Sequence, residues 1–502
     1  MRAMMMVWTE YVVQGLIYAF VLAVGLVALT LVVLLIIDRT QTRDAIRRNY
    51  PVIGRFRHLF STLGEFFRQY FFAMDREELP FNRAQRHWIE RAAEDKGNTV
   101  AFGSTRDLRI PGTPIFVNSA FPPLDDQATA APAMMIGPDT RHPYLAQSVF
   151  NLSGMSYGAI SAPAVLALSK GAKAAGIWMN TGEGAVSEWH LKGGADIVFQ
   201  IGTAKYGVRN NEGLLDDAKL AKIAEHAQIK MFEIKLSQGA KPGKGGILPG
   251  EKVTPEIAKV RGLEVGQTSY SPNRHVEVDD WGDLLDFIAH VREVTGKPTG
   301  IKLCIGALEP IAEFFALIRK RGEASAPDFI TLDGGEGGTG AAPMPLIDLV
   351  GMSIRESLPL VADLRAEYQL HDRIRLVAAG KLVNPGDVAW ALAAGADFVT
   401  SARGFMFSLG CIQALKCNKN TCPTGITTHN PRLQQGLVVE EKFVRVKQYA
   451  EGIVHEVETL AHSVGVAEPR QLRRDHVRIV QPDGTSVPMS MLYPGKRKPK
   501  IA

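Results

Sequence analysis

The longest apolar pattern in the chain lies near the amino terminus, where residues 11–37 contain no charged side chain. Its core, Leu16–Ile37, is long enough as a helix to cross roughly 30 Å of hydrocarbon, so it predicts a transmembrane helix. A cleaved signal peptide would have a shorter apolar region and a small-residue cleavage site, whereas Asp38 follows this run directly. We therefore predict a membrane anchor over residues 1–38.

Arginines are concentrated on one side of this helix. Only Arg2 precedes it, and the ones that follow are Arg39, Arg43, Arg47, Arg48, Arg55 and Arg57. Because cationic flanks stay in the cytoplasm, this distribution predicts a single-pass protein of the cytoplasmic membrane with its catalytic domain inside the cell.

Residues 39–142 form a predicted juxtamembrane and lead-in region. From Phe56 to Met74 aromatic residues recur with helical spacing, which predicts an amphipathic helix; it could lie in the lipid headgroup region, or be a second hairpin helix or a core helix. From Asp75 to His142 charged residues are frequent and prolines interrupt any long element, so turns and short strands are expected there.

From about Tyr144 short apolar runs alternate with helix-sized segments. The strand candidates are Ser148–Ser153, Trp178–Thr181, Ile197–Ile201, Phe232–Leu236, Thr299–Ile305, Phe329–Leu332, Ile374–Ala378 and Phe398–Ser401. The helix candidates include Pro163–Ala175, Asp216–His226, Trp281–Val294, Pro310–Arg321, Pro345–Tyr368 and Pro385–Ala394. This alternation predicts an α/β fold, a (β/α)8 TIM barrel over residues 143–440, with a doubly wound open sheet as the alternative. A carboxy-terminal helix and tail would follow over residues 441–502.

Composition adds little to this picture. A chain of 502 residues with 46% hydrophobic and 22% charged residues is ordinary globular material with room for a large core. The net charge of +5 is small for this length, and no basic stripe with interleaved aromatic residues occurs, so nucleic-acid binding is not expected.

Three of the four cysteines, Cys411, Cys417 and Cys422, lie in one short segment after the eighth predicted strand. Thiolates suit zinc, Cu(I) or iron–sulfur clusters, but a structural zinc site normally needs a fourth Cys or His, and none lies in this run. The remaining one, Cys304, belongs to an apolar run and is expected to be a packed thiol. The odd number favours a [3Fe-4S] cluster; zinc and plain buried cysteines are the alternatives.

Glycines follow the last three predicted strands. Gly337 and Gly338 follow the sixth strand, Gly380 follows the seventh and Gly404 the eighth. Phosphate groups in such barrels bind between the loops after strands seven and eight, where bare backbone N–H groups approach the oxygens. The first strand leads into Ser153–Ile160, whose small residues would let a flat ring lie against the backbone. The pattern predicts a phosphate-bearing cofactor.

Lysines follow the fourth strand. Lys235 stands at the strand end and Lys241 is framed by small residues, so both are expected to contact a dianionic substrate, since each buried carboxylate needs a cationic partner. Lys244 and Lys252 are expected to lie in solvent. Glu183 follows the second strand and faces the same mouth.

Several of these motifs together resemble the FMN-binding synthase domain of glutamate synthase. The resemblance extends from about Ser148 to Leu433 and rests on residues 155–161, Asn180–Gly184, residues 234–246, residues 337–343 and the spacing Cys411-x5-Cys417-x4-Cys422-Pro423. It implies FMN and a [3Fe-4S] cluster as cofactors. It also implies reduction of 2-iminoglutarate, made from 2-oxoglutarate and ammonia, to L-glutamate, an oxidoreductase reaction at a CH–NH2 group.

The resemblance also implies roles for individual residues. The cluster ligands would be Cys411, Cys417 and Cys422, and the catalytic residues Lys241, Glu183 and Lys235. The flavin-binding residues would be Met155, Ser156, Asn180, Lys235, Gly337 and Gly338, with Gly380, Lys381, Ala402, Arg403 and Gly404 at the phosphate.

The sequence departs from that family in four ways. It has no amidotransferase domain, so ammonia would come free or from a separate glutaminase subunit. It has no second Gly-rich nucleotide domain, so electrons would come from a donor protein or subunit through the cluster. The amino-terminal span resembles shorter, stand-alone glutamate-synthase-like proteins of bacteria. Gly334–Glu336 replaces a His-Asp pair, which leaves the roles of Asp333 and Glu336 open.

Two other functions remain alternatives. One is a membrane-tethered flavin and iron–sulfur electron-transfer protein. The other is a different FMN barrel oxidoreductase, acting on another oxo acid. An α-hydroxy-acid oxidase would need a His and Arg pair near strand seven, and an inosinate-dehydrogenase-like enzyme a cysteine after strand six; neither is present.

Overall fold

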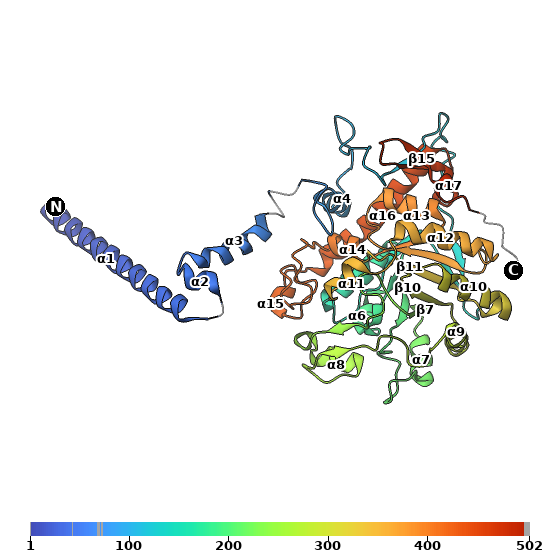
Figure 1. Cartoon of the computed structure of the whole chain (residues 1–502), viewed down its shortest axis with the longest axis horizontal. Coiled ribbons are helices and arrows are strands. Elements are labelled where there is room, and N and C mark those ends of the chain that lie inside the picture. Colours follow the sequence, from blue (N-terminus) through green and yellow to red (C-terminus); the bar gives the residue numbers. More distant parts are fainter. Residues whose placement is uncertain (1, 43, 68–70, 72–73, 496–502) are drawn as a thin grey trace. The chain divides into compact units, whose positions relative to one another are not determined.

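The computed structural model describes residues 2–42, 44–67, 71 and 74–495. The chain divides into two compact units, residues 1–84 and residues 85–502. Figure 1 shows the helices of the first unit and the barrel of the second.

The first unit contains the predicted amino-terminal helix. Helix α1 (Arg2–Thr40) is followed by α2 (Ala45–Asn49) and α3 (Gly54–Phe67). Within α1, the segment Trp8–Thr40 contains an 18-residue window with a mean hydropathy of 3.2, and no residue of that window is buried. Its length and apolarity are sufficient to cross a membrane. The predicted helix from Phe56 to Met74 is confirmed up to Phe67, and residues 68–70 and 72–73 lie outside the described part of the chain.

The second unit is built on a closed barrel of eight parallel strands. The strands are β4 (Phe150–Leu152), β5 (Trp178–Asn180), β6 (Asp196–Ile201), β7 (Ile229–Lys235), β10 (Thr299–Leu303), β11 (Phe329–Asp333), β12 (Arg375–Ala379) and β13 (Phe398–Ser401). Because β13 pairs with β4, the sheet has no open edge. The predicted (β/α)8 barrel is confirmed, and the doubly wound alternative is wrong.

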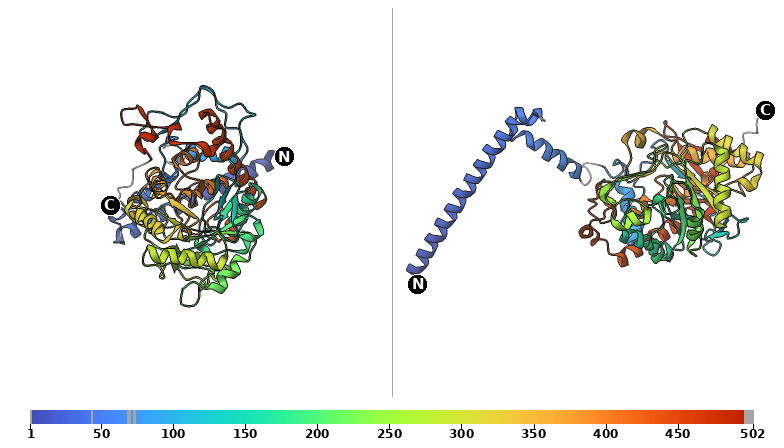
Figure 2. Two further views of the ribbon diagram at one scale, coloured as in Figure 1. Left: turned by 90° about the vertical axis from the view of Figure 1, so that its right-hand side faces the viewer. Right: turned by 90° about the horizontal axis from the view of Figure 1, so that it is seen from below.

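Helices surround these strands (Figures 1 and 2). They are α5 (Ala162–Ala174), α6 (Glu188–Gly193), α7 (Asp217–Ala224), α9 (Trp281–Thr295), α10 (Glu309–Arg321), α12 (Ile354–Glu367), α13 (Pro385–Ala394) and α16 (Val439–Val464). Polar caps begin several of them: Asp216, Asp280 and Asn384 accept N–H groups of the first turns of α7, α9 and α13.

Two helix predictions need correction. The segment Pro345–Tyr368 is not one helix, because α11 (Met344–Leu349) ends before α12 begins. Between them Gly351 has a φ of 100°, and an added Cβ would lie 2.7 Å from Cys304 Sγ. The lead-in region, expected to hold only turns and strands, also contains α4 (Arg83–Ala93). This helix is possible because no proline occurs between Pro80 and Pro111.

One end of the barrel is closed by a hairpin. Strands β2 (Met134–Ile136) and β3 (Tyr144–Ala146) pair antiparallel, and Ile136 and Tyr144 join a buried cluster with Trp178, Phe329 and Phe398. Trp178, Phe329 and Phe398 each begin a barrel strand, so this cluster fills the amino-terminal end. Ligands must therefore enter at the carboxyl ends of the strands.

The lead-in and the tail share a second sheet. Strand β1 (Pro114–Phe116) pairs antiparallel with β14 (Val477–Val480), which pairs with β15 (Ser486–Pro488). The tail ends with α17 (Met489–Leu492).

The mouth of the barrel is covered by the long segment between β7 and α9. It contains a hairpin of β8 (Ile247–Leu248) and β9 (Ser269–Tyr270), and α8 (Pro255–Arg261). Helix α14 (Arg403–Ser408) follows β13 and leads into the cysteine segment, which ends at α15 (Pro431–Gln434) and contacts the β7–α9 segment.

Candidate active site

Two adjoining cavities occupy the mouth of the barrel. One has an empty volume of about 590 Å³ and lies over the strand ends, and the other, of about 940 Å³, lies under the β7–α9 segment. Both are lined by Ser156, Glu183, Gly338, Ala402 and Arg403, so they form one continuous site.

The smaller cavity has the features of a phosphate-bearing cofactor site. Gly380 and Lys381 follow β12, and Ala402 and Arg403 follow β13; all four line this cavity. An added Cβ at Gly338 would lie 2.8 Å from Arg403 Nε, so the backbone here is kept bare. Thr400 presents a buried hydroxyl that has no hydrogen-bond partner among the described residues. The predicted flavin site therefore fits FMN in its bare backbone, its unpaired hydroxyl and its cationic groups.

The predicted flavin-binding residues do not all lie in this cavity. Met155 lines the larger cavity instead. Asn180 lies below the mouth, where its amide donates to Glu233 Oε1 at 2.8 Å. Gly337 lines neither cavity. Gly404 packs against Tyr449, whose Oη would be 2.0 Å from an added Cβ, and its N–H donates to Ser401 Oγ at 3.3 Å.

Below the cavities, buried polar groups form the floor of the site. Glu233 accepts hydrogen bonds from Asn180, from Gln200 Nε2 at 2.6 Å and from Thr331 Oγ1 at 2.6 Å. Lys302 lies 3.6 Å from Asp333 Oδ2, which also accepts the N–H of Gly239 at 3.0 Å. These strand residues thus hold the loop that carries Lys241.

The three predicted catalytic residues come together. Glu183, on the 3-10 turn Gly182–Gly184 after β5, accepts a hydrogen bond from Lys235 Nζ at 2.9 Å. Lys241 Nζ lies 3.8 Å from the other carboxylate oxygen, and Lys235 also donates to Gln238 Oε1 at 2.5 Å. Burial raises the pKa of Glu183, but Lys235 and Lys241 outweigh it and lower that pKa to about 2. Glu183 is therefore an anion that orients both lysines.

A buried arginine, Arg261, completes the cationic lining. It is 4% exposed, ends α8 and lines the larger cavity. Its guanidinium donates to the carbonyl of Tyr157 at 2.5 Å and stacks over the ring of Tyr206 at 5.1 Å. Burial lowers its pKa, and Nε has no partner. No carboxylate of the described residues pairs directly with this cation, so it can bind an anion in the cavity.

Lys252 also lies in this wall, which corrects the expectation that it is solvated. It is 2% exposed, and its Nζ donates to the carbonyls of Ala159 at 2.9 Å and Cys417 at 2.7 Å. Burial lowers its pKa to about 8. Lys252 thus joins the first βα loop to the cysteine segment, whereas Lys244 is exposed as expected.

Little in the sequence indicates that Arg261 and Lys252 are buried in the site. Both lie in the Gly- and Pro-containing segment after β7, where a lone cation is usually in solvent. The length of that segment between two barrel elements was the one usable signal, because long connections in barrels often cover the active site.

Of the three clustered cysteines, one lines the larger cavity. That cysteine is Cys417, and Arg403 Nη1 lies 3.9 Å from its sulfur. Burial raises the pKa of Cys411 to about 11. For Cys422 burial also raises the pKa, but hydrogen bonds from Thr424 and Thr427 outweigh it and lower the pKa overall. No three His, Cys, Asp or Glu side chains in the described part of the chain are arranged as a metal site. The segment fits a cluster by donor type and spacing.

The residues that replace the family's His-Asp pair have structural contacts. Glu336 accepts the N–H of Ile354 at 3.1 Å, and so caps the start of α12. Cys304, the expected packed thiol, is separate from the other three, and burial raises its pKa to about 12.

Comparisons with known proteins match most of this chain to one family. Residues 123–467 match the conserved region in glutamate synthase. The glutamate synthase large subunit-like protein YerD of Bacillus subtilis (strain 168) is 40% identical over 92% of this chain and 96% of that protein. The archaeal-type glutamate synthase [NADPH] of Thermotoga sp. (strain RQ2) is 33% identical over 64% of this chain and 60% of its own length. A crystal structure of mandelate oxidase with benzoyl-formic acid is 17% identical, with a TM-score of 0.45, over 78% of this chain and 98% of that one.

Proposed function

This chain belongs to the glutamate synthase family, and on that basis we propose that it reduces 2-iminoglutarate, formed from 2-oxoglutarate and ammonia, to L-glutamate. Its cofactors would be FMN and a [3Fe-4S] cluster. The observation that carries this proposal is the excess of buried cations, Lys235, Lys241 and Arg261, around the single carboxylate of Glu183, beside a cavity suited to a flavin. A dicarboxylate would neutralise that excess.

FMN, when bound in the smaller cavity, supplies hydride transfer to the imine carbon. Lys381 and Arg403 would neutralise its phosphate between the loops after β12 and β13. The bare backbone at Gly338 and Gly380 would admit the cofactor to that part of the site.

The residues of the larger cavity would bind and orient the substrate. Arg261 and Lys241 would each hold a carboxylate, and because both are buried, water would not compete strongly for them. Lys235 Nζ, held by Glu183 and Gln238, would donate a proton to the substrate oxygen or nitrogen. Glu183, which is already ionised, would stabilise the ammonium group of the product.

Cys411, Cys417 and Cys422 are proposed as the ligands of the cluster, on the wall next to Arg403. Lys252 and a hydrogen bond from Ser161 Oγ to the carbonyl of Gly425 at 2.7 Å would hold this segment against the first βα loop. Electrons would come from a separate donor protein or subunit, and ammonia free or from a separate glutaminase subunit. Helix α1 would anchor the protein in the cytoplasmic membrane as a single span, with its catalytic domain in the cytoplasm.

The test begins with the absorption spectrum of the purified chain, which should show bound flavin. Flavin-loaded protein, chemically reduced and supplied with 2-oxoglutarate and ¹⁵N-ammonium, should form ¹⁵N-glutamate. Lys241→Ala should lower the efficiency of glutamate formation by roughly 10²-fold, whereas Lys244→Ala, which alters an exposed lysine of the same loop, should leave it unchanged. Flavin-loaded wild-type protein that forms no glutamate under these conditions would refute the proposal.

A further inference from the structure

Helix α3 exposes a continuous apolar face in the first unit. Ile53, just before the helix, is 71% exposed, Phe56 is 50% and Phe60 is 66% exposed. These residues are three or four positions apart and therefore lie on one side of a helix. Leu59, which is 50% exposed, extends the same face. Large apolar side chains exposed in this pattern indicate a surface that is covered by lipid or by another molecule.

The charges around α3 are basic and flank this face. At 100° per residue, Arg55 and Arg57 fall on opposite sides of the face that is centred on Phe56. Residues 38–57 contain six arginines and only two aspartates. An apolar face with arginines at its two edges suits a helix that lies in the plane of a membrane surface, because the long side chains reach up to the phosphates.

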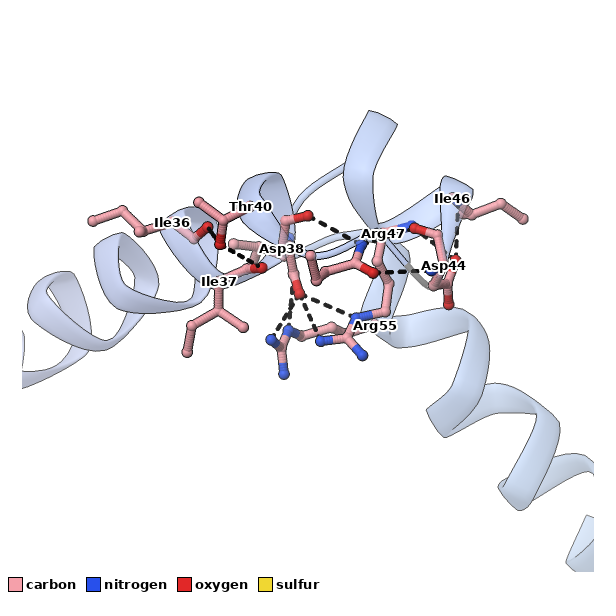
Figure 3. A network of polar contacts seen from close by, with 10 residues as sticks. Ile36, Ile37, Asp38, Thr40, Asp44, Ile46, Arg47 and Arg55 are labelled. Atoms are coloured by element: carbon pink, nitrogen blue, oxygen red, sulfur yellow. Dashed lines mark hydrogen bonds and ion pairs between the residues drawn. The ribbon is translucent and has the colours of Figure 1, made fainter.

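A buried ion cluster joins the end of α1 to α3 (Figure 3). The side chain of Asp38 is fully buried, and its Oδ1 accepts Arg47 Nη2 at 2.7 Å and Arg55 Nη2 at 2.7 Å. Its Oδ2 accepts Arg55 Nε at 2.8 Å and the N–H of Val52 at 2.9 Å. These contacts fold residues 44–53 back, so that the start of α3 is held at the last turn of α1.

We propose that α3 lies in the interface of an anionic phospholipid bilayer, with its apolar face toward the acyl chains and the exposed Arg57 at the phosphates. The inference rests on the proposed role of α1 as a membrane span. If α1 spans, Asp38 lies at the boundary of the hydrocarbon, where an unpaired carboxylate is costly, and two guanidinium groups neutralise it. The same cluster fixes α3 at that boundary, which favours lipid over a protein as the occupant of the face.

The test uses the full chain in nanodiscs of phosphatidylcholine and phosphatidylglycerol. The photo-crosslinker p-benzoylphenylalanine replaces Phe60, and in a matched control it replaces Phe121, which is 91% exposed and lies in the second unit. Mass spectrometry should find lipid adducts at position 60 in clear excess over position 121. Adducts mainly to a second copy of the chain, or lipid adducts no more abundant than at position 121, would overturn the proposal.

A second pair of variants tests the ion cluster. Asp38→Asn should remove most of the lipid adduct at position 60, because Arg47 and Arg55 lose their shared anion. Asp44→Asn should not, since Asp44 caps α2 and asparagine caps equally well. An unchanged adduct yield in Asp38→Asn would refute the role of the cluster. Extraction of membranes with carbonate tests the proposed role of α1 separately. A wild-type chain that spans the membrane should stay in the membrane fraction, and its release would refute the span rather than the position of α3.

Discussion

Arg261 offers the sharpest test of the proposed substrate. Replacing it by methionine keeps most of the side-chain volume and removes a buried guanidinium that lines the larger cavity. Its distance to a bound carboxylate would be close to 4 Å, and at an effective dielectric constant of about 20 such a contact contributes about 4 kcal/mol. Part of this is lost to desolvation of both ions, and truncations of buried charge pairs generally cost about 2–5 kcal/mol.

We therefore expect Arg261→Met to weaken binding of 2-oxoglutarate by about 3 kcal/mol, or roughly 10²-fold in Kd. Isothermal titration calorimetry on the flavin-loaded chain measures this directly. The monocarboxylate 2-oxobutyrate supplies the comparison: if Arg261 holds the second carboxylate, the wild-type preference for the diacid disappears in the variant. Equal weakening of both ligands would mean that Arg261 acts by shaping the cavity, and would refute the reasoning.

The chain contains a matched control for this experiment. Arg209 also stacks over the ring of Tyr206, at 5.0 Å, and its Nη2 donates to the carbonyl of Gly262 at 2.8 Å. It does not line the cavity. Arg209→Met removes a stacked arginine without removing charge from the site, so binding of 2-oxoglutarate should stay within about twofold of wild type.

Three further predictions address the other parts of the site. Lys241→Ala should leave the flavin absorption spectrum intact and lower kcat/KM for the oxo acid by roughly 10²-fold, the effect of losing one charged contact; unchanged kinetics would place the lysine outside the site. Cys417→Ser should lower the iron content from about three per chain and remove the electron-paramagnetic signal of the oxidised protein, while dithionite still reduces the flavin; Cys304→Ser is the control, and stoichiometric zinc without iron in the wild type would contradict the assignment. Deletion of residues 1–37 should give a protein that still binds flavin, as measured by its spectrum, because every proposed ligand belongs to the second unit; a folded truncation that binds no flavin would show that the anchor and the barrel are not independent.

The barrel was predictable because its strands are buried on both faces and stand out as short apolar runs. Phe329–Leu332 and Phe398–Ser401, for example, correspond to β11 and β13 almost residue for residue. That Glu183, Lys235 and Lys241 lie together followed from the same reasoning, since the carboxyl ends of parallel strands meet at one mouth. The ion pairs that Glu183 makes with both lysines were not predicted, because the lysines were expected to contact substrate carboxylates.

The other residues of the site could not be predicted, because their burial depends on how loops fold over that mouth. Lys252 and Arg261 are buried because the β8–β9 hairpin and α8 cover the cavity, and no local pattern encodes that coverage. Asn180 was predicted to bind the flavin, but it is the last residue of β5 and its side chain donates a hydrogen bond to Glu233 in the floor of the site. A shift of one residue at a strand end reverses the side-chain direction, and sequence patterns do not locate strand ends that well.

The pairing of β1 with β14 has a practical consequence for anyone who wants a smaller catalytic fragment. The sequence suggests cutting at about residues 143 and 440, where the barrel begins and ends. Such a cut would remove both strands of that pair together with α16, which covers α5 and α13. Val446 and Ile453 of α16 are buried, so the apolar residues that pack against them would be exposed to water. A usable fragment should instead start near residue 85 and retain the tail through Leu492.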